Sequence, residues 1–218
     1  MSSRLTMALP KGRNLQATVK LLRKIGFSAL DFPEGSRRLI FEDRDLEVDF
    51  LTLRDLDIPT YVEHGAADMG IVGKDILLEQ QKDVYEPLDL KFGACRLVLA
   101  KPKDAPVISD AARLSHIRVA TKFPRITTEY MIRKGIQVEV IKLYGSIELA
   151  PIVGLSEWIV DLVSSGRTLA ENGLVEVEEI DRATTRLIVN RASHKTKFDR
   201  VESMIDKLRV ALVGQPRP

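Results

Sequence analysis

The sequence predicts an α/β protein made of two lobes, and three observations support this prediction. Short apolar runs alternate with segments of helical periodicity along most of the chain. The chain has 218 residues, of which 44% are hydrophobic, so it is long enough to bury one or two cores. Two stretches, Val84–Ala100 and Leu174–Asn190, share a layout in which one apolar strand leads through a short break into another.

Strands are expected where apolar and β-branched residues cluster between turn or helix signals. In chain order, the expected strands are Leu5–Leu9, Leu39–Phe41, Leu46–Leu53, Met69–Val72, Ile117–Ala120, Val138–Leu143 and Trp158–Val163. Trp158, which opens the last of these strands, is expected in the core or an interface.

Helices are expected between the strands and at the end of the chain. The segment Leu15–Ile25 has apolar residues at helical spacing, and Gly26 is placed to end it. The segment Ile126–Lys134 ends in the same way, at Gly135. A last helix over Arg200–Val213 has one apolar face and is expected to pack on the first lobe; that face consists of Val201, Met204, Ile205 and Leu208.

The two similar stretches suggest how the lobes are divided. We expect them to be paired crossings, each lobe ending with a strand contributed to the other. The first lobe then comprises residues 1–92 plus 182–218, and the second comprises residues 93–181. Such a chain forms a cleft between its lobes, where small ligands commonly bind.

Composition narrows the class of protein. The formal net charge of +2 gives no whole-molecule positive field of the kind that nucleic-acid binders carry. The single cysteine, Cys95, cannot form an internal disulfide, and His64, His116 and His194 are too scattered to suggest a zinc site. No signal peptide or membrane-spanning apolar run is found, so we expect a cytoplasmic protein.

The most informative stretch is Trp158–Leu169, where an apolar strand runs into a hydroxyl-rich turn and then a helix start. Hydroxyls, a glycine and free N–H groups at a helix N-terminus suit a phosphate. The candidate ligand residues are Ser164, Ser165, Gly166, Arg167 and Thr168. An ordinary strand followed by a helix N-cap fits the same spacing.

A second candidate is the turn between the first strand and the first helix, which contains Lys11 and Arg13. Cations are unfavourable at a helix start unless an anion compensates them, so this pattern favours an anionic ligand. Solvated turn residues are the alternative.

A third candidate is Ala67–Asp75, in which Gly73 and Lys74 open a helix. It is not a Walker A motif, because Asp68 stands where the first glycine is required and Asp75 where a Ser or Thr is required. What remains is a glycine-bearing strand end at which the backbone can approach a ligand closely.

Less specific signals lie elsewhere. Arg37, in the basic turn before the strand at Leu39–Phe41, is either a solvated residue or a phosphate contact. Arg54 follows a strand, where charges ordinarily cap the next helix. Glu148 lies one turn into a predicted helix with Ser146 as its cap, so it is a candidate dipole partner.

Six ordered motifs across almost the whole chain resemble the ATP phosphoribosyltransferase family. They are Ala8–Arg13, Leu53–Asp55 with Asp57–Val62, Ala67–Asp68 with Gly70–Asp75, Ile141–Ser146 with Glu148–Pro151, Asp161–Leu169, and Glu171–Leu174. Each is weak alone, but six in this order are specific. The resemblance implies two α/β lobes similar to type II periplasmic binding proteins, with the active site in a cleft between them.

The resemblance also implies roles for individual residues. The loop Asp161–Leu169 would bind 5-phosphoribosyl-1-pyrophosphate (PRPP), with Glu148 contacting the ribose. The family often has Thr at the position of Ser165, and this change keeps the hydroxyl. Cations would face the phosphates, Arg13 and Arg37 as catalytic groups at the departing pyrophosphate and Lys11 and Arg54 as phosphate-orienting groups. Gly73 and Asp75 would lie on the ATP side.

The implied reaction is attack by adenine N1 of ATP on the anomeric carbon of PRPP, the first step of histidine biosynthesis. Mg²⁺ would be carried mainly by PRPP. The length resembles the short form of the family, which implies a homodimer and a hetero-oligomer with a regulatory subunit similar to histidyl-tRNA synthetase. The alternative that stays open here is a solute-binding protein of the same two-lobed fold.

Overall fold

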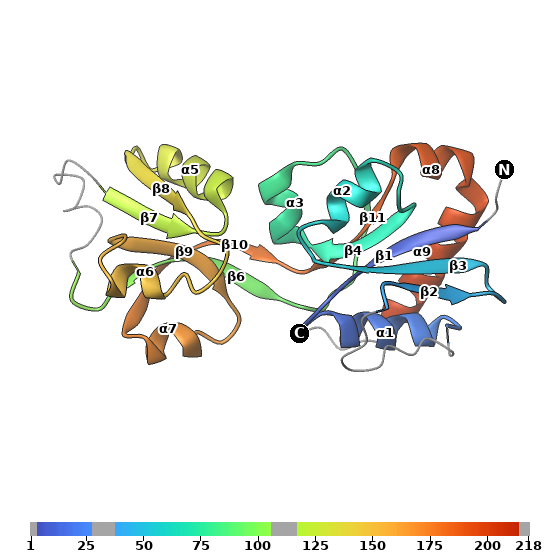
Figure 1. Ribbon diagram of the computed structural model, residues 1–218, viewed down its shortest axis with the longest axis horizontal. Coiled ribbons are helices and arrows are strands. Elements are labelled where there is room, and N and C mark those ends of the chain that lie inside the picture. Colours follow the sequence, from blue (N-terminus) through green and yellow to red (C-terminus); the bar gives the residue numbers. More distant parts are fainter. Residues whose placement is uncertain (1–3, 28–37, 106–116, 214–218) are drawn as a thin grey trace. The chain divides into compact units, whose positions relative to one another are not determined.

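The computed structural model describes residues 4–27, 38–105 and 117–213. It separates into two compact units, residues 1–94 with 184–218 and residues 95–183. The chain enters the second unit between β5 (Tyr85–Asp89) and β6 (Cys95–Pro102), and it returns between β10 (Leu174–Ala183) and β11 (Thr185–Val189) (Figure 1). Both breaks lie two residues later than the boundaries expected from the sequence, 92/93 and 181/182.

The first unit contains a six-stranded sheet of order β2-β3-β1-β4-β11-β5. Its centre is parallel: β1 (Leu5–Pro10) pairs in parallel with β3 (Val48–Leu53) and with β4 (Met69–Gly73). The antiparallel strands are β2 (Ile40–Asp43), β11 and β5. The carboxyl ends of β1, β3 and β4 therefore meet at one edge of this sheet, and the segments that follow them start there.

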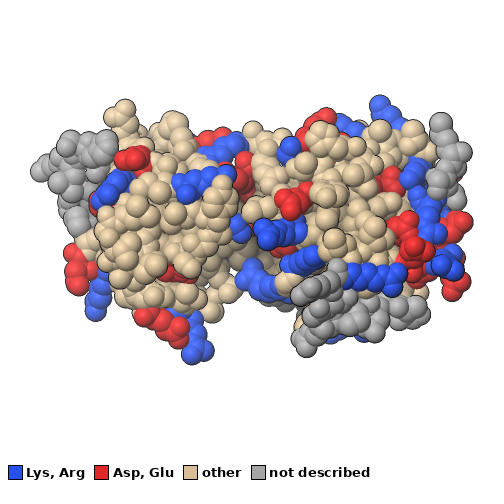
Figure 2. Space-filling view, in the orientation of Figure 1, with Lys and Arg blue, Asp and Glu red and all other residues tan. Residues whose placement is uncertain are grey.

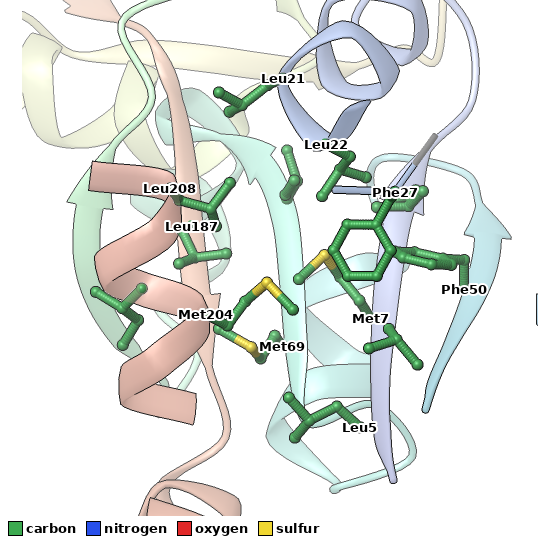
Figure 3. Packing of buried hydrophobic residues seen from close by; sticks show 14 of the residues in the cluster. Leu5, Met7, Leu21, Leu22, Phe27, Phe50, Met69, Leu187, Met204 and Leu208 are labelled. Atoms are coloured by element: carbon green, nitrogen blue, oxygen red, sulfur yellow. The ribbon is translucent and has the colours of Figure 1, made fainter. Parts of the chain in front are cut away.

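One face of this sheet is covered by α1 (Leu15–Lys24) and α9 (Phe198–Val213). Phe27 and Phe50 meet edge to face, with ring centroids 5.1 Å apart (Figure 3). Helix α9 contributes the apolar side chains predicted from its spacing, and all four are buried in this core: Val201, Met204, Ile205 and Leu208. The prediction that the last helix packs on the first lobe is confirmed.

The other face of the sheet is covered by α2 (Ile58–Glu63) and α3 (Lys74–Gln80). A Cβ placed on Gly70 would lie 2.7 Å from Ile58 Cγ2 and 2.8 Å from Val62 Cγ2. Gly70 is therefore required for close packing of α2 on β4. We expected the glycines of this strand to let the backbone approach a ligand, and at least one of them instead serves core packing.

A buried acid fastens the C-terminal segment to the sheet. Asp68, 4% exposed, accepts hydrogen bonds from the Ser193 hydroxyl at 2.6 Å, the Lys197 ammonium at 2.8 Å and the Thr6 backbone N–H at 2.8 Å. Ser193 belongs to α8 (Arg191–Thr196), whose N-cap Asn190 accepts a hydrogen bond from the Ser193 N–H. Asp68 precedes β4, so this tie lies at the edge of the sheet opposite its carboxyl ends.

The second unit contains a five-stranded sheet of order β10-β6-β9-β7-β8. Three neighbouring strands run parallel, β7 (Ile117–Thr121), β8 (Val138–Lys142) and β9 (Trp158–Val163), and β6 pairs antiparallel with both β9 and β10. Its helices are α5 (Pro124–Arg133), α6 (Leu149–Ile152) and α7 (Arg167–Glu171). Trp158 is 1% exposed, which confirms a core position.

Most of the expected helices and strands begin and end within two residues of their predicted bounds. The start of β3 differs for a clear structural reason. The strand expected from Leu46 begins at Val48. Asp43 Oδ1 accepts a hydrogen bond from the Leu46 N–H, and Glu47 has a left-handed backbone with φ of 52°. These two features form a tight turn between β2 and β3, so the apolar Leu46 lies outside the strand. Among the described residues, no helix is long and apolar enough to cross a membrane.

Candidate active site

The carboxyl edge of the first sheet carries exposed cations. Lys11 and Arg13 follow β1, Arg54 follows β3, and the Lys11 backbone N–H donates to Leu53 O at 2.9 Å. None of the three cationic side chains forms an ion pair or side-chain hydrogen bond with any residue that the structure describes. Arg37, predicted to act with them, lies outside the described residues.

Several other cations on the protein are paired with neighbouring carboxylates. Arg118 and Glu157 form a close ion pair of 2.6 Å that raises the pKa of the arginine, and Arg96 is similarly bound by Glu176 at 2.8 Å. Figure 2 shows Lys and Arg side chains gathered on the first unit near the carboxyl end of β1. The cations that follow β1 and β3 therefore remain available to an anionic ligand.

Gly73 and Asp75 also lie at the carboxyl edge of the first sheet, where β4 ends and α3 begins. Gly73 is the N-cap of α3, and Asp75 lies in its first turn. A Cβ on Gly73 would lie 2.1 Å from Asp75 Oδ1, so the carboxylate folds back over the glycine. An acid in this position stabilises the helix dipole, which gives Asp75 a local structural role.

The hydroxyl-rich turn of the second unit follows β9. Gly166 is the N-cap of α7 with φ of 75°, a left-handed backbone that favours glycine, and no side chain caps this helix. The first helical N–H with a backbone acceptor is that of Ala170, which donates to Gly166 O at 3.1 Å. Ser164, Ser165 and Thr168 are exposed. The ordinary N-cap that we kept as the alternative is thus not formed by these hydroxyls.

Arg167 differs from the exposed cations of the first unit. Its Nε donates to Glu171 Oε1 at 2.7 Å, one turn along α7. The side chains are 83% and 61% exposed, and an ion pair this exposed stabilises a helix very little. Arg167 can exchange this partner for a ligand at small cost.

Two acidic side chains lie beside this turn. Glu148 follows β8, and Asp161 lies within β9. Burial, and to a smaller extent the charge of Glu148, raise the pKa of Asp161 to about 6. The hydrogen bond from the Leu162 N–H and the charge of Lys122 act in the opposite direction and lower this pKa. A carboxyl with such a pKa changes its charge close to physiological pH, which is a property of functional sites.

The prediction that Ser146 caps a helix containing Glu148 is wrong. Ser146 has a left-handed backbone with φ of 50°, and its carbonyl accepts a hydrogen bond from the Leu149 N–H at 3.1 Å. Glu148 itself is the N-cap of α6 and makes no side-chain capping bond. The tight turn at Ser146 delays the helix, so the Glu148 carboxylate is not used as an internal cap.

The sequence reasoning missed a residue at the end of the neighbouring strand. Lys122 follows β7 and is half-buried, and it acts electrostatically on Asp161. The signal that could have located it is topological: parallel neighbours end at the same edge of a sheet, so the residue after β7 adjoins β9.

The predicted site residues thus form two groups, each at the carboxyl edge of its own sheet. In the first unit they are Lys11, Arg13, Arg54, Gly73 and Asp75; in the second they are Glu148, Asp161, Ser164, Ser165, Gly166, Arg167 and Thr168. Among residues that the structure describes, no three His, Cys, Asp or Glu side chains are grouped so that they could hold a metal ion.

Two solved structures have a fold similar to that of this chain. The chain is similar to the ATP phosphoribosyl transferase (HisG:HisZ) complex from Thermotoga maritima, with a TM-score of 0.82 and 38% identity over 97% of this chain and 100% of that chain. It also resembles the alkanesulfonate-binding protein SsuA from Xanthomonas axonopodis pv. citri, with a TM-score of 0.58 and 12% identity over 96% and 73% of the two chains. The second likeness shows a shared fold alone, that of two-lobed binding proteins.

Comparison of sequences bears on the family. The family model described as HisG, ATP phosphoribosyltransferase, matches residues 54–210. An ATP phosphoribosyltransferase from Geobacter metallireducens is 57% identical over 208 residues, which are 95% of this chain and 98% of that protein. Identity of this extent, together with the site residues described above, decides between the enzyme and the binding protein. The chain belongs to the ATP phosphoribosyltransferase family.

Proposed function

We propose that the chain joins ATP to PRPP, giving N1-(5-phosphoribosyl)-ATP and pyrophosphate, with the roles of its residues divided between the two sheet edges. The observation that carries the proposal is the turn after β9. Three exposed hydroxyls, a left-handed glycine and uncapped backbone N–H groups occur there, on a chain of this family. Such groups bind a phosphate without a large net charge.

In this proposal the turn grips the 5-phosphate of PRPP through Ser164, Ser165 and Thr168. Gly166 and Arg167 complete the loop, the first by allowing close approach of the backbone and the second by leaving Glu171 for the phosphate. Glu148 and Asp161 accept hydrogen bonds from the ribose hydroxyls. Asp161 can do so fully only when ionised, which its pKa of about 6 permits at neutral pH.

The cations of the first unit act on the anions that must be aligned and released. Arg13 stabilises the pyrophosphate as it departs, and we assign the same role to Arg37. Lys11 and Arg54 orient phosphates, while Gly73 and Asp75 shape the ATP side. Lys11, Arg13 and Arg54 are exposed and have no ion-pair partner in the described part of the chain, which supports their assignment, since no internal pair has to be broken.

The chemistry requires no general base. Adenine N1 is unprotonated at neutral pH, so its lone pair attacks the anomeric carbon while the bond from that carbon to pyrophosphate breaks, with inversion. Two polyanions must be brought together, and positive charge develops on the ribose ring. Alignment and electrostatic stabilisation therefore supply most of the catalysis.

We assign Mg²⁺ to PRPP and water and to no protein cage. This ion keeps several waters and binds substrate phosphates together with only one or two carboxylates in most enzymes. The cations of the first unit then meet a pyrophosphate whose charge Mg²⁺ has partly neutralised. We place the reaction in the cytoplasm, where a free thiol such as Cys95 stays reduced.

Pyrophosphate release tests the proposed function. The purified chain is incubated with PRPP, Mg²⁺ and one acceptor at a time: ATP, other purine nucleotides, or free bases. Release with ATP alone, and a product that carries the ribose on N1, is expected. Release with another base in preference to ATP would change the acceptor, and PRPP binding without release under any condition would indicate a binding protein.

We further propose that the chain forms a homodimer and assembles with a regulatory subunit that resembles histidyl-tRNA synthetase. The similarity to the HisG chain of the Thermotoga maritima HisG:HisZ complex supports this. We expect the chain alone to be little inhibited by histidine and the assembled complex to be strongly inhibited, because the effector would bind the second subunit. Initial rates against histidine concentration, with and without that subunit, measure the difference. Saturating inhibition of the chain alone, non-competitive with PRPP, would place the effector site within this chain.

A further inference from the structure

Lys122 lies at the carboxyl edge of the second sheet, immediately after β7. Thr121 is the register partner of Val160 on β9, and its hydroxyl donates to Val160 O at 2.7 Å. Continuing this register by one residue places Lys122 beside Asp161. The Phe123 backbone N–H donates to Thr121 Oγ1 at 2.9 Å, and the Phe123 side chain is 1% exposed. The backbone on both sides of Lys122 is therefore fixed.

Within the part of the chain that the structure describes, the Lys122 side chain has no partner that would explain its position. It is half-buried, yet it forms no ion pair or hydrogen bond with any residue of the described ranges 4–27, 38–105 and 117–213. Partial burial of an ammonium costs free energy unless an anion compensates it. Lys134, on the same unit, shows the usual arrangement, with its ammonium 2.6 Å from a carboxylate oxygen of Glu178.

The charged groups that act on Asp161 in the structure are Glu148 and Lys122, and the neutral Leu162 backbone N–H also donates a hydrogen bond to it. Two carboxylates and one cation thus lie next to the hydroxyl-rich turn. Two carboxylates alone would repel the phosphates of PRPP, so a cation beside them has an electrostatic purpose.

We propose that Lys122 is a positioning residue for PRPP, whose ammonium group balances the negative charge of Asp161 and donates a hydrogen bond to a phosphate oxygen of the substrate. This inference rests on the proposed function, because it takes the turn after β9 as the PRPP site. It adds a second cation, besides Arg167, to a group of residues that also offers hydroxyls, backbone N–H groups and carboxylates.

The experiment measures PRPP binding by calorimetric titration at about pH 8 and about pH 6.5, for the wild type and for Lys122→Met and Lys122→Arg. Lys122→Met should weaken binding about tenfold at the higher pH, because one charge-assisted hydrogen bond is lost. At about pH 6.5 it should weaken binding about threefold more, because loss of the cation raises the pKa of Asp161 above its value of about 6. Lys122→Arg keeps the charge and should restore most of the affinity at both pH values.

The matched control is Lys142→Met, which removes a cation from the end of the adjacent strand β8, where the side chain is exposed. It should leave PRPP affinity unchanged at both pH values. A second readout is the pH dependence of kcat/KM for PRPP: its acidic limb should move up in Lys122→Met, stay in place in Lys122→Arg, and disappear in Asp161→Asn.

Folded Lys122→Met that binds PRPP as tightly as the wild type would overturn the inference and leave the proposed function intact. An equal loss of affinity at the two pH values would overturn the assigned coupling to Asp161. If Lys122→Met does not fold, Lys122→Gln and Lys122→Arg are compared in the same titration, and equal affinity of the two would also overturn it. Failure of the wild type to release pyrophosphate with ATP would instead contradict the proposed function, and the titration distinguishes the two failures.

Discussion

The carboxyl edges of the two sheets offer different chemistry to a substrate. The edge of the first unit carries three exposed cations, Lys11, Arg13 and Arg54, without ion-pair partners among the described residues. The edge of the second unit carries exposed hydroxyls, a left-handed glycine and two carboxylates. The first edge attracts anions through charge, and the second selects one phosphate through geometry.

This difference suits two substrates that are both polyanions. A long-range attraction by unpaired arginines stabilises charge wherever it develops, including on a leaving group. Short hydrogen bonds from hydroxyls and N–H groups discriminate by shape and distance. If the division is correct, substitutions in the first unit should affect turnover and substitutions in the second should affect PRPP affinity.

The largest effect is expected away from both site edges, at the tie through which Asp68 fastens the C-terminal segment to the first sheet. Asp68→Ala removes the acceptor for Ser193, Lys197 and the Thr6 N–H, and it leaves the Lys197 ammonium with the Arg4 carbonyl but without its carboxylate. Loss of this part-buried ion pair together with two hydrogen bonds to a buried carboxylate should lower the free energy of unfolding by about 3 to 5 kcal/mol. Urea denaturation measures it. Asp68→Asn, which keeps hydrogen-bonding capacity, should lose less, and a loss below about 1 kcal/mol for the alanine variant would remove Asp68 from this role.

The next effect concerns the first unit. Arg13→Ala should lower the turnover number about a hundredfold, about 3 kcal/mol, and raise the KM for ATP much less, because the charge is needed as pyrophosphate departs. Steady-state rates at saturating substrates check this. Lys20→Ala, an exposed lysine farther along α1, is the matched control and should change neither constant. An unaltered turnover number in Arg13→Ala would break the comparison.

A smaller effect is expected for the second unit. Replacing Ser165 and Thr168 together by Ala should weaken PRPP binding by roughly 2 kcal/mol, about thirtyfold, and leave ATP binding unchanged. Calorimetric titration with each ligand separates the two. Ser203→Ala, an exposed serine on α9, controls for loss of a surface hydroxyl. Equal losses for ATP and PRPP would show that the turn does not select one substrate.

The sequence predicted elements whose signals are local. Apolar runs and glycine stops placed β1, β9, α1 and α9 within two residues, because period, propensity and breakers act within one segment. The hydroxyl-rich turn was located for the same reason, since its strand, glycine and helix start are contiguous. Arg37 remains a prediction, because it lies outside the described residues.

Signals that depend on distant residues were missed. Lys122 is unremarkable in its own segment and gains meaning only when β7 pairs with β9. The glycine-bearing strand end of Ala67–Asp75 was interpreted as a place of ligand approach, whereas one of its glycines, Gly70, packs against Ile58 and Val62 from another element. The pairing of Asp68 with Ser193 and Lys197 spans more than half of the chain, and no local pattern encodes it.

The smallest effect concerns the free energy of unfolding that is lost because Asp161 is ionised at the carboxyl edge of the second sheet. The pKa of Asp161 is about 6 in the folded protein and lies near its ordinary value of 3.8 in the unfolded chain. The folded state therefore takes up the proton first, so stability rises as pH falls from about 7 to about 4 and the ionised side chain destabilises the fold above that range. Asp161→Asn cannot ionise, and it should raise the free energy of unfolding by about 1 to 2 kcal/mol at about pH 8, after allowance for partial exposure, and by almost nothing at about pH 4. Urea denaturation at the two pH values measures the difference.

The same variant should bind PRPP more weakly at about pH 8, since a carboxylate that the fold disfavours is expected where a substrate requires it. A gain in stability that is equal at both pH values would show that Asp161 is not the group responsible, and unchanged PRPP affinity would remove it from the site.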